Sequence, residues 1–202
     1  RCDAIIFSKS KGFVPPSDKT DIEKLRNKLL RLTTYHEGNF DLVVVGAGLA
    51  GLSAAISAAR LGLRVALIHN RPMLGGNNST EVRVGASGGI NLPPYRNIGN
   101  VVSEIGNVFN DHERVMKIIK NEPNIVLYTN MNGDGVEMDG NRIKMVSATD
   151  ILTLSKHQFN CKYVADCSGD GVIGFLAGAD YMIGREKRKD FNELLAPEVD
   201  DN

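Results

Sequence analysis

Apolar residues along the chain form short continuous runs and helical stripes, and the densest pattern lies between residues 42 and 68. Residues 42–45 are an uninterrupted apolar run in which three of the four residues are β-branched, which is typical of a strand buried on both faces of a parallel sheet. Residues 52–61 continue as an Ala-rich helix that ends before Gly62, and residues 63–68 form a second apolar run. The pattern predicts one complete βαβ unit.

The chain before this unit predicts two further elements. Residues 3–7 form an apolar strand that ends before Pro15-Pro16, and we interpret it as the tail of a preceding β-domain. Thr20 and Glu23 have capping-box spacing, which predicts the start of a helix. The apolar stripe of this helix consists of Ile22, Leu25, Leu29 and Leu32. We expect the stripe to pack against the βαβ unit, with binding to a partner as the alternative.

After the βαβ unit the pattern predicts a loop, two helices and a series of short strands. The first helix is expected after Gly99. Asp111 is placed to N-cap the second helix, whose apolar face contains Val115, Ile118 and Ile119. Asp139-Gly140 predicts a hairpin turn between two of the strands. The predicted strands cover residues 125–129, 135–138, 143–149, 151–155 and 163–167.

Three glycines follow the first strand in the spacing G-x-G-x-x-G: Gly46, Gly48 and Gly51. Gly46 is expected to form the tight turn, Gly48 to let the backbone approach a diphosphate, and Gly51 to let the helix pack closely on the strand. The helix N-terminus adds free N–H groups and a partial positive charge. The turn therefore predicts a dinucleotide diphosphate site. Its remaining residues are Ala47, Leu49 and Ala50.

Residues 42–59 are 18 uncharged residues, which is also the length of a membrane span. The glycine spacing, two serines and Arg60 immediately afterwards argue against a span. We therefore predict no membrane span here.

The end of the second strand bears on the identity of the nucleotide. An acid that binds ribose hydroxyls usually stands there, but this chain has His69 and Asn70. Either side chain is able to hydrogen-bond a ribose. Arg71 follows, and a nearby Arg is typical of sites for the 2′-phosphate of NADP. Spacing alone leaves FAD and NADP open.

Composition and cysteine spacing bear on two further classes of function, nucleic-acid binding and metal binding. Lys plus Arg and Asp plus Glu both number 24 among 202 residues, so the formal net charge is zero. This balance gives no indication of a nucleic-acid partner. Cys2, Cys161 and Cys167 form no C-x-x-C pair, and the four histidines are scattered. The sequence therefore predicts no metal site, and Cys161 and Cys167 are expected to be ordinary buried thiols.

Several motifs together carry a family resemblance. They are Val43-Val-Val-Gly-Ala-Gly-Leu-Ala-Gly51, Arg71-Pro-Met-Leu-Gly-Gly-Asn-Asn-Ser79 and Ala165-Asp-Cys-Ser-Gly-Asp-Gly171, with the shorter Gly184-Arg-Glu, Phe191-Asn-Glu and Ala196-Pro-Glu. Over roughly residues 40–200 the chain resembles the FAD-dependent oxidoreductases with two dinucleotide-binding folds. Within this group it is most similar to proteins like the A-type subunit of heterodisulfide reductase.

The resemblance implies a noncovalent FAD whose ADP half lies on the 46–51 turn. It places Gly75, Gly76 and Asn77 along the pyrophosphate and toward the flavin. Gly169 and Asp170 correspond to a second FAD contact, where a carboxylate accepts hydrogen bonds from ribityl or ribose hydroxyls. Taken alone, residues 168–171 are typical of a simple turn.

The resemblance also implies a fold class. The fold is α/β: a Rossmann-like FAD-binding domain with a parallel sheet, interrupted by an antiparallel β-meander over residues 125–162. The chain is interpreted as an excerpt of a longer protein. Its expected parts are the tail of a preceding β-domain (1–18), a linker helix (19–40), an FAD/NAD(P)-binding domain (41–184) and the start of a following region (185–202).

Two departures from the family pattern are visible in the sequence. The family commonly has an acid near residues 69–70, so ribose binding here rests on different groups. The iron–sulfur cysteines of true heterodisulfide reductases have no counterpart, which argues against a disulfide-reductase activity.

The function expected from these observations is an FAD-dependent oxidoreductase that transfers hydride or electrons. Its expected partners are a small-molecule substrate and an electron donor or acceptor; the fragment alone is expected to be inactive. Arg83 is a candidate for stabilising negative charge on reduced flavin or on an anionic substrate, with a surface or structural salt bridge involving Glu81 or Arg83 as the alternative. No catalytic acid or base is assigned. The other functions considered are an NADP-binding dehydrogenase domain and a non-catalytic nucleotide-binding module.

Overall fold

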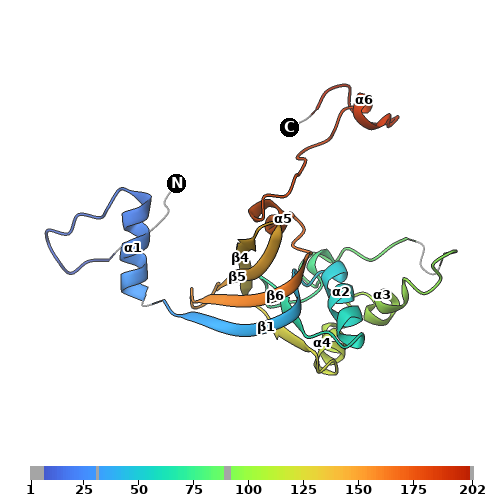
Figure 1. Cartoon of the computed structure of the whole chain (residues 1–202), viewed down its shortest axis with the longest axis horizontal. Coiled ribbons are helices and arrows are strands. Elements are labelled where there is room, and N and C mark those ends of the chain that lie inside the picture. Colours follow the sequence, from blue (N-terminus) through green and yellow to red (C-terminus); the bar gives the residue numbers. More distant parts are fainter. Residues whose placement is uncertain (1–6, 31, 89–91, 201–202) are drawn as a thin grey trace.

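The computed structural model describes residues 7–30, 32–88 and 92–200. Its centre is a six-stranded sheet with the strand order β3-β2-β1-β6-β5-β4. Figure 1 labels β1, β6, β5 and β4 of this sheet. Strands β3, β2, β1 and β6 are parallel, whereas β5 and β4 are antiparallel to their neighbours. The predicted α/β fold with a parallel sheet and an antiparallel part is confirmed. The strands are β1 (Thr34–Val45), β2 (Val65–Ile68), β3 (Ile125–Tyr128), β4 (Met131–Asp139), β5 (Arg142–Asp150) and β6 (Lys156–Asp166).

Three helices cover one face of the parallel strands (Figure 1): α2 (Leu49–Arg60), α3 (Asn100–Ile105) and α4 (His112–Lys120). Leu52 and Ile56 of α2 are fully buried against the sheet and the neighbouring helices. Burying a side chain of this size contributes about 1.5–3 kcal/mol. The N-cap of α4 is Asp111, as predicted, because its carboxylate accepts a hydrogen bond from the N–H of Arg114 at 2.9 Å.

The antiparallel part covers the opposite face of the same sheet. Phe159 of β6 and Val146 of β5 share a buried cluster with Ala66 and Ile68 of β2, although β2 is not their neighbour in the strand order. The sheet is therefore curved, so that side chains of β5 and β6 pack over the face of β2 that the helices do not cover. Ile173 of α5 (Val172–Leu176) closes this cluster.

The glycines of the turn after β1 permit a very close approach of three elements. A Cβ added to Gly51 would lie 1.8 Å from the carbonyl oxygen of Gly46. A Cβ added to Gly46, whose φ is +104°, would lie 2.1 Å from the carbonyl oxygen of Cys167, just after β6. The tight turn at Gly46 and the close packing at Gly51 are therefore as predicted.

The N-terminal part differs from the sequence-based predictions. Helix α1 (Lys19–Leu30) is capped by Asp18, whose Oδ1 accepts hydrogen bonds from the N–H groups of Thr20 and Asp21, and not by Thr20. The helix stands apart from the sheet (Figure 1), and Leu29 is 64% exposed. The expected packing of its apolar stripe on the βαβ unit is therefore wrong.

Strand boundaries also differ. Strand β1 begins at Thr34, so residues 34–40 of the predicted linker belong to the sheet. Residues 151–155, predicted as a strand, form a turn because the Asp150 carboxylate accepts hydrogen bonds from the N–H groups of Leu152 and Thr153. Strand β3 pairs in parallel with β2, so the antiparallel meander is confined to β4, β5 and β6.

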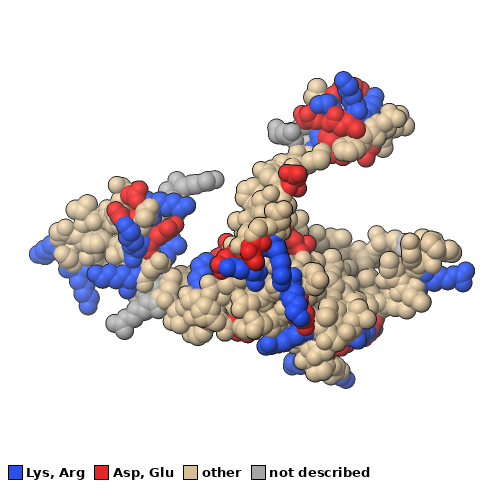
Figure 2. Space-filling model, viewed as in Figure 1, with Lys and Arg blue, Asp and Glu red and all other residues tan. Residues whose placement is uncertain are grey.

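Residues 3–6 of the first predicted strand lie outside the described residues. The segment that carries α6 (Arg188–Phe191) extends away from the sheet (Figure 1). Side chains of both signs occur on the α1 segment, the sheet domain and the α6 segment (Figure 2).

The close approach at Gly51 predicts a large destabilisation by a single methyl group. Gly51→Ala places its Cβ 1.8 Å from a backbone oxygen that cannot move freely, so we expect a loss of about 3 kcal/mol or more in the free energy of unfolding. Chemical denaturation measures this loss. Gly174→Ala is the matched control, because its Cβ would be 3.9 Å from the nearest atom; equal stabilities of the two variants would contradict the packing described here.

Candidate functional site

The site lies at the carboxyl edge of the parallel strands. Val45, the last residue of β1, pairs with Ile68, the last residue of β2, and with Asp166, the last residue of β6. Because these strands end at the same level, the segments that follow them meet at one edge of the sheet. Ligands of α/β folds bind at this edge. The topology thus brings together the turn at 46–51, the loop at 69–78 and the turn at 167–171.

These three segments line a cleft of about 500 Å³, within the range of small-molecule and cofactor sites. Twelve of the fourteen predicted site residues line it, and Ala47 and Gly51 lie buried beneath it. The twelve are Gly46, Gly48, Leu49, Ala50, His69, Asn70, Arg71, Gly75, Gly76, Asn77, Gly169 and Asp170.

Gly48 occupies the N-cap position of α2, where the first N–H groups of a helix have no partner within the helix. An added Cβ at Gly48 would meet no protein atom closer than 4.0 Å. The space above Gly48 therefore belongs to the cleft. The helix N-terminus directs its partial positive charge into the same space.

The loop with Gly75 and Gly76 packs directly on this turn. The N–H of Gly75 donates to the carbonyl oxygen of Ala47 at 2.8 Å. Gly75 has φ +111°, and an added Cβ would lie 2.9 Å from Cβ of Val108; an added Cβ on Gly76 would lie 3.1 Å from Cα of Gly48. Gly76 is therefore needed for the close approach of the two backbones, and Gly75 is needed for the positive φ of the loop where it packs against Val108.

Asn78 anchors the same loop through side-chain hydrogen bonds, a role that was not predicted from the sequence. Its side chain is buried. Its amide nitrogen donates to the carbonyl oxygen of Val84 and to Oδ1 of Asn107, and its Oδ1 accepts from the N–H of Val108 at 2.6 Å. An Asn within a run of glycine and small polar residues gives no sequence signal for this role, because its partners lie up to 30 residues away.

His69 is buried, with only 5% of its surface exposed. Its Nδ1 accepts a hydrogen bond from the N–H of Ala47 at 3.1 Å, and its Nε2 lies 3.0 Å from the carbonyl oxygen of Met73. Burial lowers the pKa of the imidazole. Both ring nitrogens are thus engaged with protein groups, so the ring offers no free nitrogen to a ribose. Asn70 is exposed at the cleft.

Arg71 and Glu81 form an ion pair, with 2.7 Å between Nη1 of Arg71 and Oε2 of Glu81. This supports the salt-bridge interpretation of Glu81. Arg83 is exposed, its Nε donates to the carbonyl oxygen of Thr80 at 3.3 Å, and it is not among the residues that line the cleft. The suggestion that Arg83 acts on the flavin is therefore not supported.

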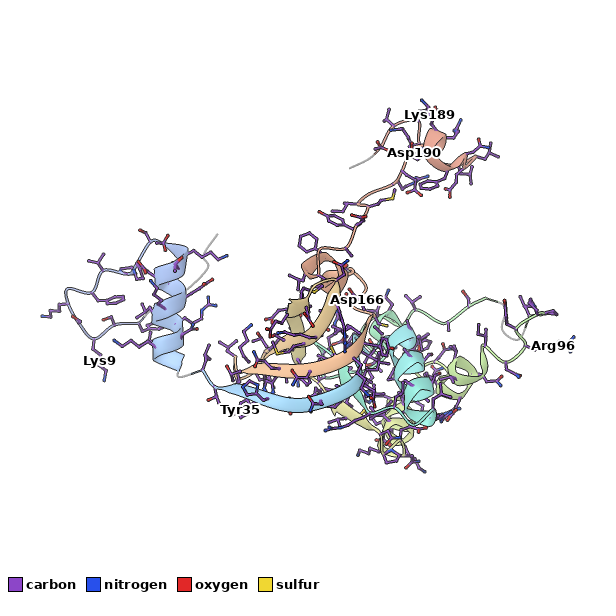
Figure 3. The ribbon with its side chains drawn as sticks, viewed as in Figure 1. Lys9, Tyr35, Arg96, Asp166, Lys189 and Asp190 are labelled. Atoms are coloured by element: carbon purple, nitrogen blue, oxygen red, sulfur yellow. The ribbon has the colours of Figure 1, made fainter. Side chains whose placement is uncertain are left out.

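Asp166 organises the turn at 168–171 and was missed by the sequence analysis. Asp166 is the last residue of β6 (Figure 3). One carboxylate oxygen accepts from the N–H and hydroxyl of Ser168, and the other accepts from the N–H groups of Ile173 and Gly174. Removal from water alone would raise the pKa of this carboxyl group, but these hydrogen bonds hold it below its usual value. Asp166 thereby presents the exposed Gly169 and Asp170 to the cleft.

Two other segments that line the cleft were also missed. Residues 84–86 and residues 131–133 contribute to its wall, and the N–H of Met131 donates to the carbonyl oxygen of His69 at 2.8 Å. Cys167 lines the cleft, and burial followed by the neighbouring Asp166 raises the pKa of its thiol. Cys161 is buried, as expected.

The described residues contain no group of three or more His, Cys, Asp or Glu side chains placed to hold a metal ion. Cys2 lies outside the described residues. Within the same described ranges, every helix is too short or too polar to cross a bilayer.

A family model described as FAD dependent oxidoreductase matches residues 41–200. The soluble pyridine nucleotide transhydrogenase of Ectopseudomonas mendocina is 54% identical over 39 residues, which are 19% of this chain and 8% of that protein. The fumarate reductase (cytochrome) of Shewanella frigidimarina is 51% identical over 51 residues, 25% of this chain and 8% of that protein. The chain therefore matches less than a tenth of the length of these curated relatives.

Two solved structures share the fold at low identity. A flavoprotein/dehydrogenase from Cytophaga hutchinsonii has a TM-score of 0.55 at 14% identity, covering 73% of this chain and 44% of its own. A geranylgeranyl bacteriochlorophyll reductase-like protein from Thermoplasma acidophilum has a TM-score of 0.52 at 14% identity, and the match covers 76% of this chain and 45% of that protein. The specific resemblance to heterodisulfide reductase stays a prediction. Since the family model spans most of the chain, the chain belongs to the FAD-dependent oxidoreductase family, whose cofactor is FAD.

Proposed function

We propose that this chain forms the FAD-binding portion of an oxidoreductase, with FAD held noncovalently in the cleft and its diphosphate on the 46–51 turn. The observation that carries the proposal is the open space above Gly48, at the N-terminus of α2, where an added Cβ meets no protein atom closer than 4.0 Å. Backbone N–H groups and a helix dipole at such a point favour a diphosphate.

The other residues of the cleft fit the same cofactor. Gly75 and Gly76 bring a second stretch of backbone beside the turn, so that a diphosphate is approached from two sides without intervening side chains. Across the cleft, Asp170 presents a carboxylate, which accepts hydrogen bonds from hydroxyl groups of a ribose or ribityl chain.

Bound FAD supplies the hydride or electron transfer. The contribution of this chain is to orient the cofactor and to shield its diphosphate. The partners of the complete reaction are a small-molecule substrate and an electron donor or acceptor.

The alternative cofactor, NADP, depends on Arg71. Recognition of a 2′-phosphate needs a guanidinium group free to form a charge-assisted contact. In this chain Arg71 is paired with Glu81 at 2.7 Å, so its charge is already balanced by a neighbour on the same loop. The ion pair therefore favours FAD over NADP at this position.

Gly48→Val tests the diphosphate position. The Cβ of the new side chain has no protein atom closer than 4.0 Å, so we expect retained secondary structure together with loss of FAD binding, because the isopropyl group occupies the space of the diphosphate. Far-UV circular dichroism and flavin content of the purified variant measure the two effects. Gly12→Val is the matched control, since an added Cβ at Gly12 meets nothing within 4 Å; stoichiometric flavin in Gly48→Val would exclude this turn as the site.

Asp170→Ala tests whether the turn after β6 belongs to the cofactor site. Loss of hydrogen bonds to a charged acceptor is worth about 1.5–3 kcal/mol, which corresponds to a roughly ten- to hundredfold rise in the dissociation constant for FAD. Titration of the apoprotein with FAD, corrected for the folded fraction, measures this change. Asp180→Ala, an exposed aspartate that does not line the cleft, should bind FAD as the wild type does. Wild-type affinity in Asp170→Ala would restrict the site to residues 46–77.

A further inference from the structure

The hydrogen bonds of His69 specify one protonation state of its ring. The N–H of Ala47 cannot accept a proton, so Nδ1, at 3.1 Å, must carry a lone pair. The carbonyl oxygen of Met73 cannot donate, so Nε2, at 3.0 Å, must carry the hydrogen. The ring is therefore neutral and is the Nε2–H tautomer.

The two partners of His69 belong to the two backbone segments of the proposed cofactor site. Ala47 lies between Gly46 and Gly48 in the diphosphate turn, and its carbonyl oxygen accepts from the N–H of Gly75. Met73 lies two residues before Gly75 in the glycine loop. The imidazole thus connects the turn and the loop beside the backbone hydrogen bond between Gly75 and Ala47.

We propose that His69 is a positioning residue which, as a neutral Nε2–H imidazole, fastens the diphosphate turn to the glycine loop, in place of the acid that binds ribose at this position in related folds. The inference rests on the proposed FAD site, because the fastened segments are the ones expected to hold the diphosphate. A doubly protonated ring would direct an N–H of Nδ1 at the N–H of Ala47 and break the connection.

The surroundings of the ring are consistent with this role. Burial lowers the pKa of His69, and the charged groups that act on it are Arg71, which lowers the pKa, and Glu81, which raises it. In the turn after β1, the N–H of Ala47 donates to the ring of His69. At the start of β4, the N–H of Met131 donates to the backbone carbonyl oxygen of His69. On the other side of the glycine loop, Nε2 of His112 in α4 accepts from the N–H of Leu74 at 3.3 Å.

Three substitutions separate positioning from ribose binding. His69→Gln keeps one acceptor and one donor, and therefore is able to replace both backbone contacts. His69→Glu restores an acid, which suits a ribose hydroxyl but has no donor for the carbonyl oxygen of Met73. His69→Ala removes both contacts. His36→Gln is the control, because His36 is exposed on β1 and does not line the cleft.

The dissociation constant for FAD at neutral pH is the first measurement. We expect His69→Gln to remain within roughly threefold of the wild type, and His69→Glu and His69→Ala to bind roughly tenfold or more weakly, as expected for the loss of one or two hydrogen bonds. Equal affinities of the Gln and Glu variants, or tighter binding by Glu, would overturn the positioning role.

The second measurement needs no cofactor and distinguishes failure of this inference from failure of the proposed function. Because the pKa of folded His69 lies below the usual 6.5, the unfolded chain takes up the proton first as the pH falls. The contribution of His69 to stability is full above pH 6.5 and is lost as the pH falls through 6.5 toward the folded-state pKa. Between about pH 8 and pH 5, denaturation should show the wild type and His36→Gln losing more stability than His69→Gln, which lacks the titrating ring.

Nitrogen NMR of the ring should report the Nε2–H tautomer above pH 6.5. The Nδ1–H tautomer, or a pH dependence of stability unchanged in His69→Gln, would overturn the inference even if FAD binds. If the wild type does not bind FAD, the proposed function fails, and the tautomer and pH measurements still decide whether His69 joins the two segments.

Discussion

The backbone contact between α2, the turn after β1 and the end of β6 is the constraint on which the rest of the site depends. At Gly46 and Gly51 this contact leaves no room for a Cβ, with backbone oxygens at 2.1 and 1.8 Å from the positions such atoms would take. The close packing fixes the N-terminus of α2 at the carboxyl edge of the sheet. A helix end held further from the sheet would direct its N–H groups and its partial charge elsewhere.

The remaining parts of the cleft are organised around this contact by polar side chains whose partners are mostly backbone groups. His69 joins the turn to the glycine loop, Asn78 supports that loop, and Asp166 shapes the turn that presents Gly169 and Asp170. Each of these side chains satisfies backbone groups near the cleft, where an unpaired buried group would cost about 1–3 kcal/mol. The cleft is therefore lined largely by backbone and small side chains, which suits a cofactor with a charged diphosphate.

The sequence predicted those features that depend on local spacing. The βαβ unit, the roles of Gly46 and Gly51 and the Asp111 cap each involve residues close together in the chain, and all are present. The association of residues 169–170 with the first turn came from the family resemblance, because no local pattern connects β1 with β6. Register explains it in the structure, since Val45 pairs with Asp166.

Features that depend on distant or competing contacts were not predictable in the same way. Residues 151–155 have a strand-like composition, but the Asp150 carboxylate bonds to the next N–H groups and turns the chain. His69 was expected at a ribose because only its place after β2 is visible in sequence, whereas its partner Ala47 lies 22 residues away. Helix α1 has an apolar stripe typical of packing, yet it stands apart from the sheet (Figure 1). Periodicity indicates that a face is apolar and does not indicate what covers it.

Binding of FAD in the cleft at the end of β1, β2 and β6 underlies the proposed function. Its most direct test is calorimetric titration of the purified, cofactor-free protein with FAD and, in parallel, with NADP. We expect saturable binding of one FAD per chain and no binding of NADP at the same site. Failure to bind FAD at any concentration, or binding of NADP that FAD does not displace and that is lost in Arg71→Ala, would contradict it.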